Sequence, residues 1–242
     1  MKALHAAIVA CELCPRLRRH CTTVARVKVR RYRDEVYWGR PVPGFGDPRA
    51  RMLIIGLAPA AHGGNRTGRV FTGDDSGNWL YGTLHKFGFS NHERSVSRDD
   101  DLVLHDCYIT AAAHCAPPAN KPTRAEIDRC GVYLQQELAL LTRLRLVITL
   151  GRVAHDAWLR SSGFWDRLPP GKRPPFGHGL LTPLPDGKCV LAAYHPSRQN
   201  TNTGRLTRPM WHGIFRRARN LLDEAPSRGA SSRRHLPGAH RG

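Results

Sequence analysis

Residues 56–75 contain a group of side chains whose types can bind and react. A short apolar run at 52–55 ends at Gly56, and the loop that follows is longer than most connections between elements. The loop carries an imidazole, an amide, a guanidinium, an aromatic ring and two carboxylates, in the order His62, Asn65, Arg66, Phe71, Asp74 and Asp75. Because open parallel sheets bind ligands at the carboxyl ends of their strands, we predict that the active site includes this loop.

A second reactive segment begins at His195, at the end of another apolar run at 189–194. A His held stiffly by the following Pro196 is suited to donating a hydrogen bond to negative charge that develops on a leaving group. A His satisfied by nearby backbone is the alternative. The polar side chains around both segments suit contacts with DNA phosphates and the minor groove, although polar loops without such a role look similar; they are Asn65, Arg66, Arg198, Gln199, Asn200 and Arg205.

Two further side chains of the first loop each have two interpretations. Phe71 either stacks on a base or anchors the loop to the core. Asp74, or the adjacent Asp75, either orients a water molecule or interacts with the dipole of the helix expected from about residue 78 to 88. Ser76 or Asn78 is the expected cap of that helix.

The chain has seven cysteines, an odd number that excludes complete disulfide pairing. Cys11 and Cys14 are separated by two residues and can bind one centre together. Cys115 and Cys130 lie before and inside a later predicted helix. Four thiolates suit either zinc or an iron–sulfur cluster, and the residues alone leave both open. The other three, Cys21, Cys107 and Cys189, are expected to be ordinary core or surface residues.

The charge is strongly basic, with 38 Lys and Arg against 19 Asp and Glu. Such an excess indicates a polyanionic partner, most commonly nucleic acid, or else a generally Arg-rich composition with a basic tail. The glycine loop lacks the Gly-Lys-Ser/Thr of a phosphate-binding loop, and the cysteines lack the companion motifs of nucleobase deaminases and zinc fingers.

The elements that must position these residues alternate between strand and helix. Strands are predicted at 51–56, 108–113, 146–150 and 189–194, and helices at 1–24, 78–88, 123–141, directly after Gly151, and at 206–223. This order indicates an α/β fold, a three-layer αβα arrangement with a central four-stranded parallel sheet. Loops after the first, second and fourth predicted strands then converge on one edge.

We expect one domain over residues 1–225, with an N-terminal metal-binding segment, and a basic, disordered tail over 226–242. No N-terminal run resembles a signal peptide, and no stretch approaches the roughly 18 apolar residues that span a bilayer. The protein is therefore expected to be cytoplasmic and without a membrane partner. We also expect a monomer.

Taken together, four segments resemble the two motifs of the uracil-DNA glycosylase superfamily. They are Gly56-Leu-Ala-Pro-Ala, His62-Gly-Gly-Asn-Arg-Thr-Gly, Phe71-Thr-Gly-Asp and His195-Pro-Ser-Arg-Gln-Asn. The closest branch is the iron–sulfur type B, also called family five or UDGb, and the resemblance covers about residues 8–222. It implies a uracil-DNA glycosylase-like fold and a structural [4Fe–4S] cluster held by Cys11, Cys14, Cys115 and Cys130.

Departures from the better-known branches also match type B. Leu57 and Ala58 stand where those branches carry a polar water-activating residue, and Ala111 stands where a neighbouring branch has a pyrimidine-reading Asn. The resemblance implies a permissive pocket that extends to deaminated purines such as hypoxanthine. It also implicates residues matching Asp74 and Asn120 in catalysis.

The expected function is therefore DNA repair by hydrolysis of the N-glycosidic bond of a deaminated base in double- or single-stranded DNA. The base is flipped out of the duplex and an abasic site remains. Phe71 stacks on it, the backbone of Gly56, Leu57 and Ala58 contours the pocket, and His195 donates to the departing base. Asp74, with Asn120, positions water. With no Lys evident as a Schiff-base nucleophile, we predict a monofunctional glycosylase; the alternative is a metal-stabilised nucleic-acid-binding protein without glycosylase activity.

Overall fold

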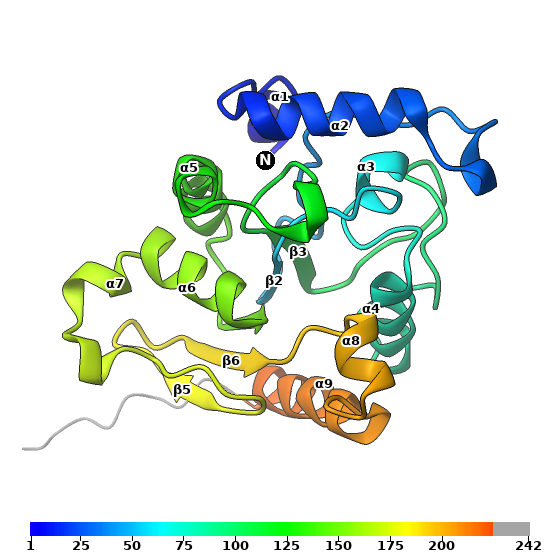
Figure 1. Ribbon diagram of the computed structural model, residues 1–242. Coiled ribbons are helices and arrows are strands. Elements are labelled where there is room, and N and C mark those ends of the chain that lie inside the picture. Colours follow the sequence, from blue (N-terminus) through cyan, green and yellow to red (C-terminus); the bar gives the residue numbers. More distant parts are fainter. Residues whose placement is uncertain (225–242) are drawn as a thin grey trace, which may run out of the picture.

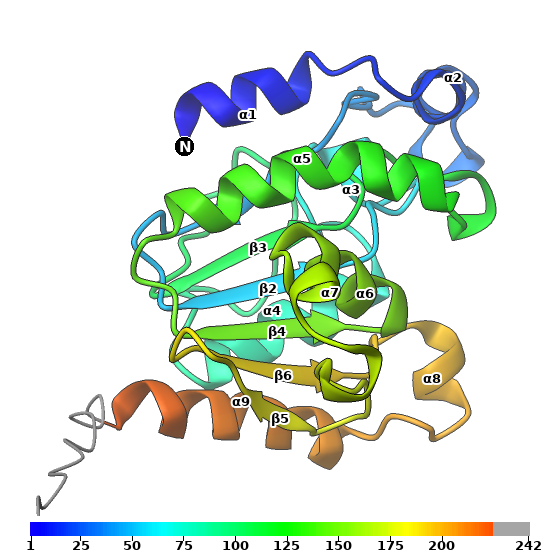
Figure 2. The same cartoon turned by 90° about the vertical axis from the view of Figure 1, so that its left-hand side faces the viewer.

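The computed structural model of the protein describes residues 1–224. Its centre is a six-stranded sheet in the order β1-β3-β2-β4-β6-β5 (Figures 1 and 2). The four central strands are parallel, and short antiparallel strands lie at both edges. The strands are β1 (Phe45–Gly46), β2 (Met52–Gly56), β3 (Cys107–Ala111), β4 (Leu146–Leu150), β5 (Leu181–Pro183) and β6 (Cys189–Ala193).

Helices cover both faces of the sheet (Figure 2). The helices are α1 (Lys2–Val9), α2 (Pro15–Val27), α3 (Gly64–Thr67), α4 (Asp75–Lys86), α5 (Arg124–Leu140), α6 (Arg152–Ser161), α7 (Phe164–Arg167), α8 (Arg198–Asn202) and α9 (Arg208–Asp223). The described residues also contain three short 3-10 helices, η1 (Arg30–Tyr32), η2 (Pro118–Asn120) and η3 (Pro170–Lys172).

The pleat of the strands divides the core in two. Met52 and Ile54 of β2 pack with α4 and α9 on one face, whereas Leu53 and Ile55 pack with α5 and α6 on the other. Because successive strand side chains point to opposite faces, a strand that is apolar throughout requires cover on both sides. The predicted three-layer αβα fold with four central parallel strands is thus confirmed.

Two edge strands were not predicted. β1 contributes only two residues and β5 only three, too few for a periodic pattern in the sequence. β5 also lies inside the segment 163–187, which was expected to be loop and which contains α7 and η3 as well. Neither edge changes the positions of the four strand ends that carry the candidate site.

The N-terminal region contains two helices rather than the one predicted over 1–24. α1 ends at Val9, and α2 begins with Pro15 in its first turn, so Cys11 lies in the break and Cys14 at the N-cap. Proline suits the first turn of a helix because no partner exists there for an N–H group. The predicted tail, residues 226–242, lies outside the described residues.

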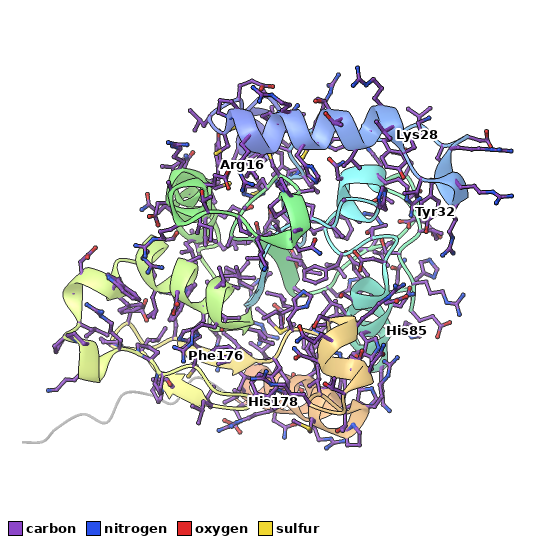
Figure 3. The ribbon with its side chains drawn as sticks, viewed as in Figure 1. Arg16, Lys28, Tyr32, His85, Phe176 and His178 are labelled. Carbon is purple, nitrogen blue, oxygen red and sulfur yellow. The ribbon has the colours of Figure 1, made fainter. Side chains whose placement is uncertain are left out.

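Capping groups decide where the helices that flank the site begin. The predicted capping box at the start of α5 is confirmed, with the side chains of Thr123 and Glu126 each accepting from the other's backbone N–H. Glu126 also accepts two hydrogen bonds from Arg16 of α2, at 2.8 and 2.7 Å, which fastens α2 to α5 (Figure 3). α4 begins at Asp75 and is capped by Asp74, not by Ser76 or Asn78.

Among the described residues, no helix is long and apolar enough to cross a membrane.

Candidate active site and cysteine cluster

Phe71 lies against the carboxyl end of β2. Its φ is 53°, and a Cβ atom added to Gly56 would lie 2.7 Å from its Cζ. The ring also stacks on the imidazole of His195, with 5.9 Å between ring centroids and 28° between planes. Glycine at position 56 therefore allows an aromatic ring to lie directly over the strand end. A half-buried ring in this position is suited to stacking on a planar base.

His195 follows β6 closely, and its position is fixed through its backbone. The His195 carbonyl accepts hydrogen bonds of 2.8 Å from the Asn200 side chain and from the Ser197 backbone. Burial lowers the pKa of His195 to about 4, so the ring is neutral at physiological pH. Within residues 1–224 no hydrogen bond to the ring is found, which leaves its one N–H free to donate to a ligand oxygen.

Asp74 is the buried carboxylate of the loop, and Asp75 is the exposed one. One Asp74 oxygen accepts from the backbone N–H of Gly77 at 2.9 Å, and the other lies where a Cβ on Gly63 would come within 2.4 Å. Burial raises the pKa of Asp74, and backbone donors partly oppose that shift. Asp75 instead pairs with Arg198 at 2.5 Å. Asp74 is thus the carboxylate that faces the first loop.

The loops after β2 and β6 are joined at the start of α4. Ser76 donates to the carbonyl of Pro196 at 3.0 Å, and the Asp75–Arg198 pair links α4 to α8. Together with the Phe71–His195 stack, these contacts bring the two predicted motifs together at the carboxyl edge of the sheet.

Among residues 1–224, no hydrogen bond joins Asn120 to this group. It is exposed at the end of η2 with a φ of 56°, and within the described residues its side chain makes no hydrogen bond. A cleft of about 740 Å³ lies elsewhere, between α1 and β1, and contains none of the predicted catalytic residues. A pocket shared by Phe71, Asp74, Asn120 and His195 therefore remains a prediction.

Two predicted DNA-binding residues of the first loop have roles inside the protein. Asn65 is completely buried and donates to the carbonyl of Cys21 at 3.3 Å, so its side chain has no exposed surface to offer to DNA in this structure. Arg66 is bound to Glu35, donates to the His62 carbonyl at 2.8 Å, and lies 4.0 Å from the ring centroid of Tyr32. These side chains fix the loop.

The side chains that follow His195 differ in whether they are already engaged within the protein or are free to contact DNA. Asn200 holds the His195 carbonyl, and the Arg205 guanidinium lies 4.9 Å from the ring centroid of Tyr194. Gln199 is exposed, and in the described part of the chain its side chain makes no hydrogen bond. Contacts between these residues and DNA remain predictions.

Tyr37 is a residue of the site that the sequence did not single out. Its hydroxyl is 3.0 Å from Nδ1 of His62, and the ring is buried. The sequence signal was weak, an aromatic side chain among alternating charges before the first strand. The contact fastens the segment before β1 to the first loop.

The four predicted metal-binding cysteines line one small cavity. Cys11 and Cys14 come from the break between α1 and α2, Cys115 follows β3, and Cys130 lies in α5. The backbone N–H of His114 donates to Sγ of Cys130 at 3.3 Å. Segments more than 100 residues apart in sequence are thereby brought together.

The surroundings of the cavity fit a sulfur-ligated group. Burial raises the pKa of Cys14 and raises that of Cys130 to about 12, so free thiolates are disfavoured unless a bound cation compensates them. Arg129 lies near Cys14 and partly opposes the rise in the pKa of its thiol, and Arg18 lies near Cys115, where a positive charge offsets excess thiolate charge.

Among the described residues, no three His, Cys, Asp or Glu side chains form a recognised group that could hold a metal ion. The shared cavity brings the four cysteines together, and four thiolates suit either zinc or an iron–sulfur cluster. Cys21, which was expected to be an ordinary core or surface residue, is fully buried in the core beside Cys115, and its thiol donates to the Ala116 carbonyl at 3.6 Å.

Comparison with known proteins identifies the family. Residues 43–219 match the model of the Uracil DNA glycosylase superfamily. The chain belongs to the uracil-DNA glycosylase superfamily.

Individual glycosylases of this superfamily place the chain within it. The Type-5 uracil-DNA glycosylase of Thermus thermophilus is 50% identical over 214 residues, which is 88% of this chain and 94% of the relative. That of Mycobacterium tuberculosis is 48% identical over 219 residues, 90% and 80% of the two chains. A Type-4 uracil-DNA glycosylase of Pyrobaculum aerophilum is 29% identical over 164 residues, 67% and 66% of the two chains. The predicted resemblance to the family-five branch is confirmed.

Proposed function

We propose that this glycosylase removes uracil from DNA by hydrolysing the bond between base and deoxyribose, releasing free base and leaving an abasic site. The observation that carries the proposal is the stack of Phe71 and His195 at the carboxyl end of β2, where an aromatic face and a free neutral N–H donor adjoin. Its membership of the family and the names of its Type-5 relatives support the same activity.

Leaving-group stabilisation is the role we assign to His195. Breaking the glycosidic bond places negative charge on the base, and a fixed donor aimed at that charge contributes about 3–4 kcal/mol. Because burial lowers the pKa of His195 to about 4, the donor is neutral imidazole, which can donate without transferring a full charge. Phe71 holds the flipped base flat, and the backbone of Gly56, Leu57 and Ala58 contours the pocket.

Water positioning is the role we assign to Asp74. Its carboxylate is fixed by the Gly77 N–H and is not neutralised by a salt bridge in the described protein, unlike that of Asp75. An anion held there stabilises positive charge on the sugar and orients the attacking water. Asn120, exposed at the end of η2, is the second residue proposed for this step.

Small side chains at the strand ends support a broader base specificity. Ala111 of β3 is the direct partner of Gly56 in the sheet, so neither strand presents a bulky or polar side chain there. We assign hypoxanthine as a second substrate because a purine needs this additional room.

Cys11, Cys14, Cys115 and Cys130 are the residues that would hold a [4Fe–4S] cluster. Such a cluster, when bound, supplies a cross-link between the N-terminal helices, the segment after β3, and α5. The Arg16–Glu126 pair already joins α2 and α5 beside it, so we propose a structural role, with the protein working as a monomer. We likewise propose that residues 1–225 form one domain, and a cytoplasmic location remains a prediction.

Base release from defined duplexes tests the proposal. A duplex with one uracil, and a second with one hypoxanthine, should become alkali-labile on incubation with the protein, and free base should appear by mass spectrometry. Duplex cleavage without alkali would contradict a monofunctional enzyme. Salt-dependent DNA binding with no base release would support the rival function, a metal-stabilised nucleic-acid-binding protein.

A further inference from the structure

The side chains predicted to bind DNA leave much of the required positive charge unassigned. Asn65 is buried, Arg66 is bound to Glu35, and Arg198 is paired with Asp75. A protein that binds DNA depends on cations that neutralise phosphates, since these supply most of the sequence-independent affinity. The remaining cations must therefore come from elsewhere on the same face.

Residues 26–33 form a dense basic segment at the end of α2 and through η1. The segment contains five basic side chains and no acidic one, namely Arg26, Lys28, Arg30, Arg31 and Arg33. Its arginines are exposed; the Arg33 side chain is 72% exposed and pairs with the exposed side chain of the adjacent Asp34 at 3.4 Å. Within the part of the chain that the structure describes, the side chains of Arg26 and Arg30 make no hydrogen bond or ion pair.

The basic segment is fastened directly to the first loop of the active site. The Arg66 guanidinium lies 4.0 Å from the ring centroid of Tyr32, and Arg66 pairs with Glu35 just beyond the segment. The backbone N–H of Trp38 donates to the Arg66 carbonyl at 2.9 Å. Arg66 is thus the link that holds the segment beside the loop, which explains why so long a cation is largely buried there.

The basic segment and α8 lie on the same side of the molecule. In Figure 2, α2 and α8 both lie at the right, the side toward which the parallel strands point. In Figure 1 they lie above and below the active-site loops, and Figure 3 labels Lys28 and Tyr32 at the upper right of that same view. A duplex placed over the strand ends would extend toward both.

We propose that residues 26–33 are a phosphate-binding arm that holds the DNA duplex on the side of the lesion pocket opposite α8. The inference rests on the proposed function, because it assumes that the polyanion is the DNA that presents the damaged base. Arg26 and Arg30 suit this role, since their guanidinium groups pair readily with phosphate oxygens and have no partner among residues 1–224 that must first be released.

The test measures how binding to a uracil-free duplex depends on salt. The variant carries Arg26→Ala, Arg30→Ala and Arg33→Ala. Each lost phosphate contact reduces the slope of log affinity against log salt by about 0.9, so the three together reduce it by roughly 2.7. Fluorescence anisotropy between about 50 and 200 mM salt covers the range in which such differences are large.

A matched control removes the same charge from other surfaces. Arg143→Ala, Lys172→Ala and Arg216→Ala replace three exposed cations in the loop before β4, in η3 and in α9. We expect the control to retain the wild-type slope. Lysines in place of Arg26, Arg30 and Arg33 should restore most of it, because the charge is kept. The single variant Arg30→Ala should lose about 0.9, which tests the arm even if the triple variant is unstable.

An unchanged slope in the alanine variants would overturn the inference. An equal loss in the control, or failure of the lysine variant to recover, would also overturn it, because either result would show that the arm has no specific electrostatic role. Since the duplex contains no uracil, these outcomes do not depend on base release. Failure of the wild-type protein to release uracil would refute the proposed function separately.

Discussion

Replacing Gly56 with Ala is expected to disturb the candidate active site through a single contact. The added Cβ would lie 2.7 Å from Cζ and 2.8 Å from Cε2 of Phe71, while ordinary contact begins at 3.4 Å. The ring must therefore move by at least about 0.7 Å, away from β2 and toward the space assigned to the base. Because a displacement of about 1 Å can cost 100-fold in rate, we expect a 10- to 100-fold loss.

Single-turnover release of uracil from a duplex, with protein in excess, measures this loss. Gly213→Ala in α9 is the matched control, because no atom lies within 4 Å of the added Cβ and an alanine inside a helix stabilises it by about 0.5–1 kcal/mol. The control should melt higher and keep the wild-type rate.

A double-mutant cycle with Phe71→Ala identifies the cause of the Gly56→Ala effect. With the ring removed, the added Cβ has nothing to displace, so Gly56→Ala should cost little further in the Phe71→Ala background. A loss of less than threefold in the single variant would refute the reasoning. So would a cost that is equal in both backgrounds, because Phe71 would not then be the neighbour that matters.

Three other predictions concern the leaving group, the cysteines and the N-terminal helices. His195→Ala should slow uracil release by about 10²–10³-fold. Because the pKa of His195 is about 4, titration of this ring should not change the wild-type rate between about pH 5 and 8. A change in rate near pH 6.5 that disappears in the His195→Ala variant would contradict this. Cys130→Ser should abolish the visible absorption of thiolate-bound iron and lower the melting temperature. Cys189→Ala, at the half-buried start of β6, should keep the wild-type absorption and melting temperature. Equal spectra for the two variants would refute the ligand assignment. Arg16→Met should lower the melting temperature at neutral pH. Glu126 has its pKa lowered to about 2 by the Arg16 hydrogen bond, so its contribution is present above pH 4.5 and is lost as pH falls through about 2, and the difference from wild type should shrink over that range.

The fold and the family could be predicted from local patterns. The strand at 146–150 matches β4, and the other three predicted strands match β2, β3 and β6 to within one or two residues at each end. Each is a short apolar run closed by a glycine or a polar segment, which is information contained in adjacent residues. The helix at 123–141 was equally clear because its capping box lies within four residues.

The roles of individual polar side chains were harder to predict. Asn65 and Arg66 were expected to contact DNA because polar residues in a loop look alike in sequence. One is buried against Cys21, and the other is held by Glu35, which lies 31 residues earlier. The helix α8 was not predicted either, because its five residues are too few to show a period.

The sequence by itself determined the order of strands and helices, the motifs of the family and the set of cysteines that can bind a cluster. Only the tertiary structure decided which polar groups remain free. It brought Asp75 to Arg198 and Phe71 to His195, left Asn120 exposed, and fastened the basic segment to the active-site loop through Arg66. The physical reason is that secondary structure follows from periodicity among neighbouring residues, whereas burial and pairing depend on side chains that arrive from distant parts of the chain.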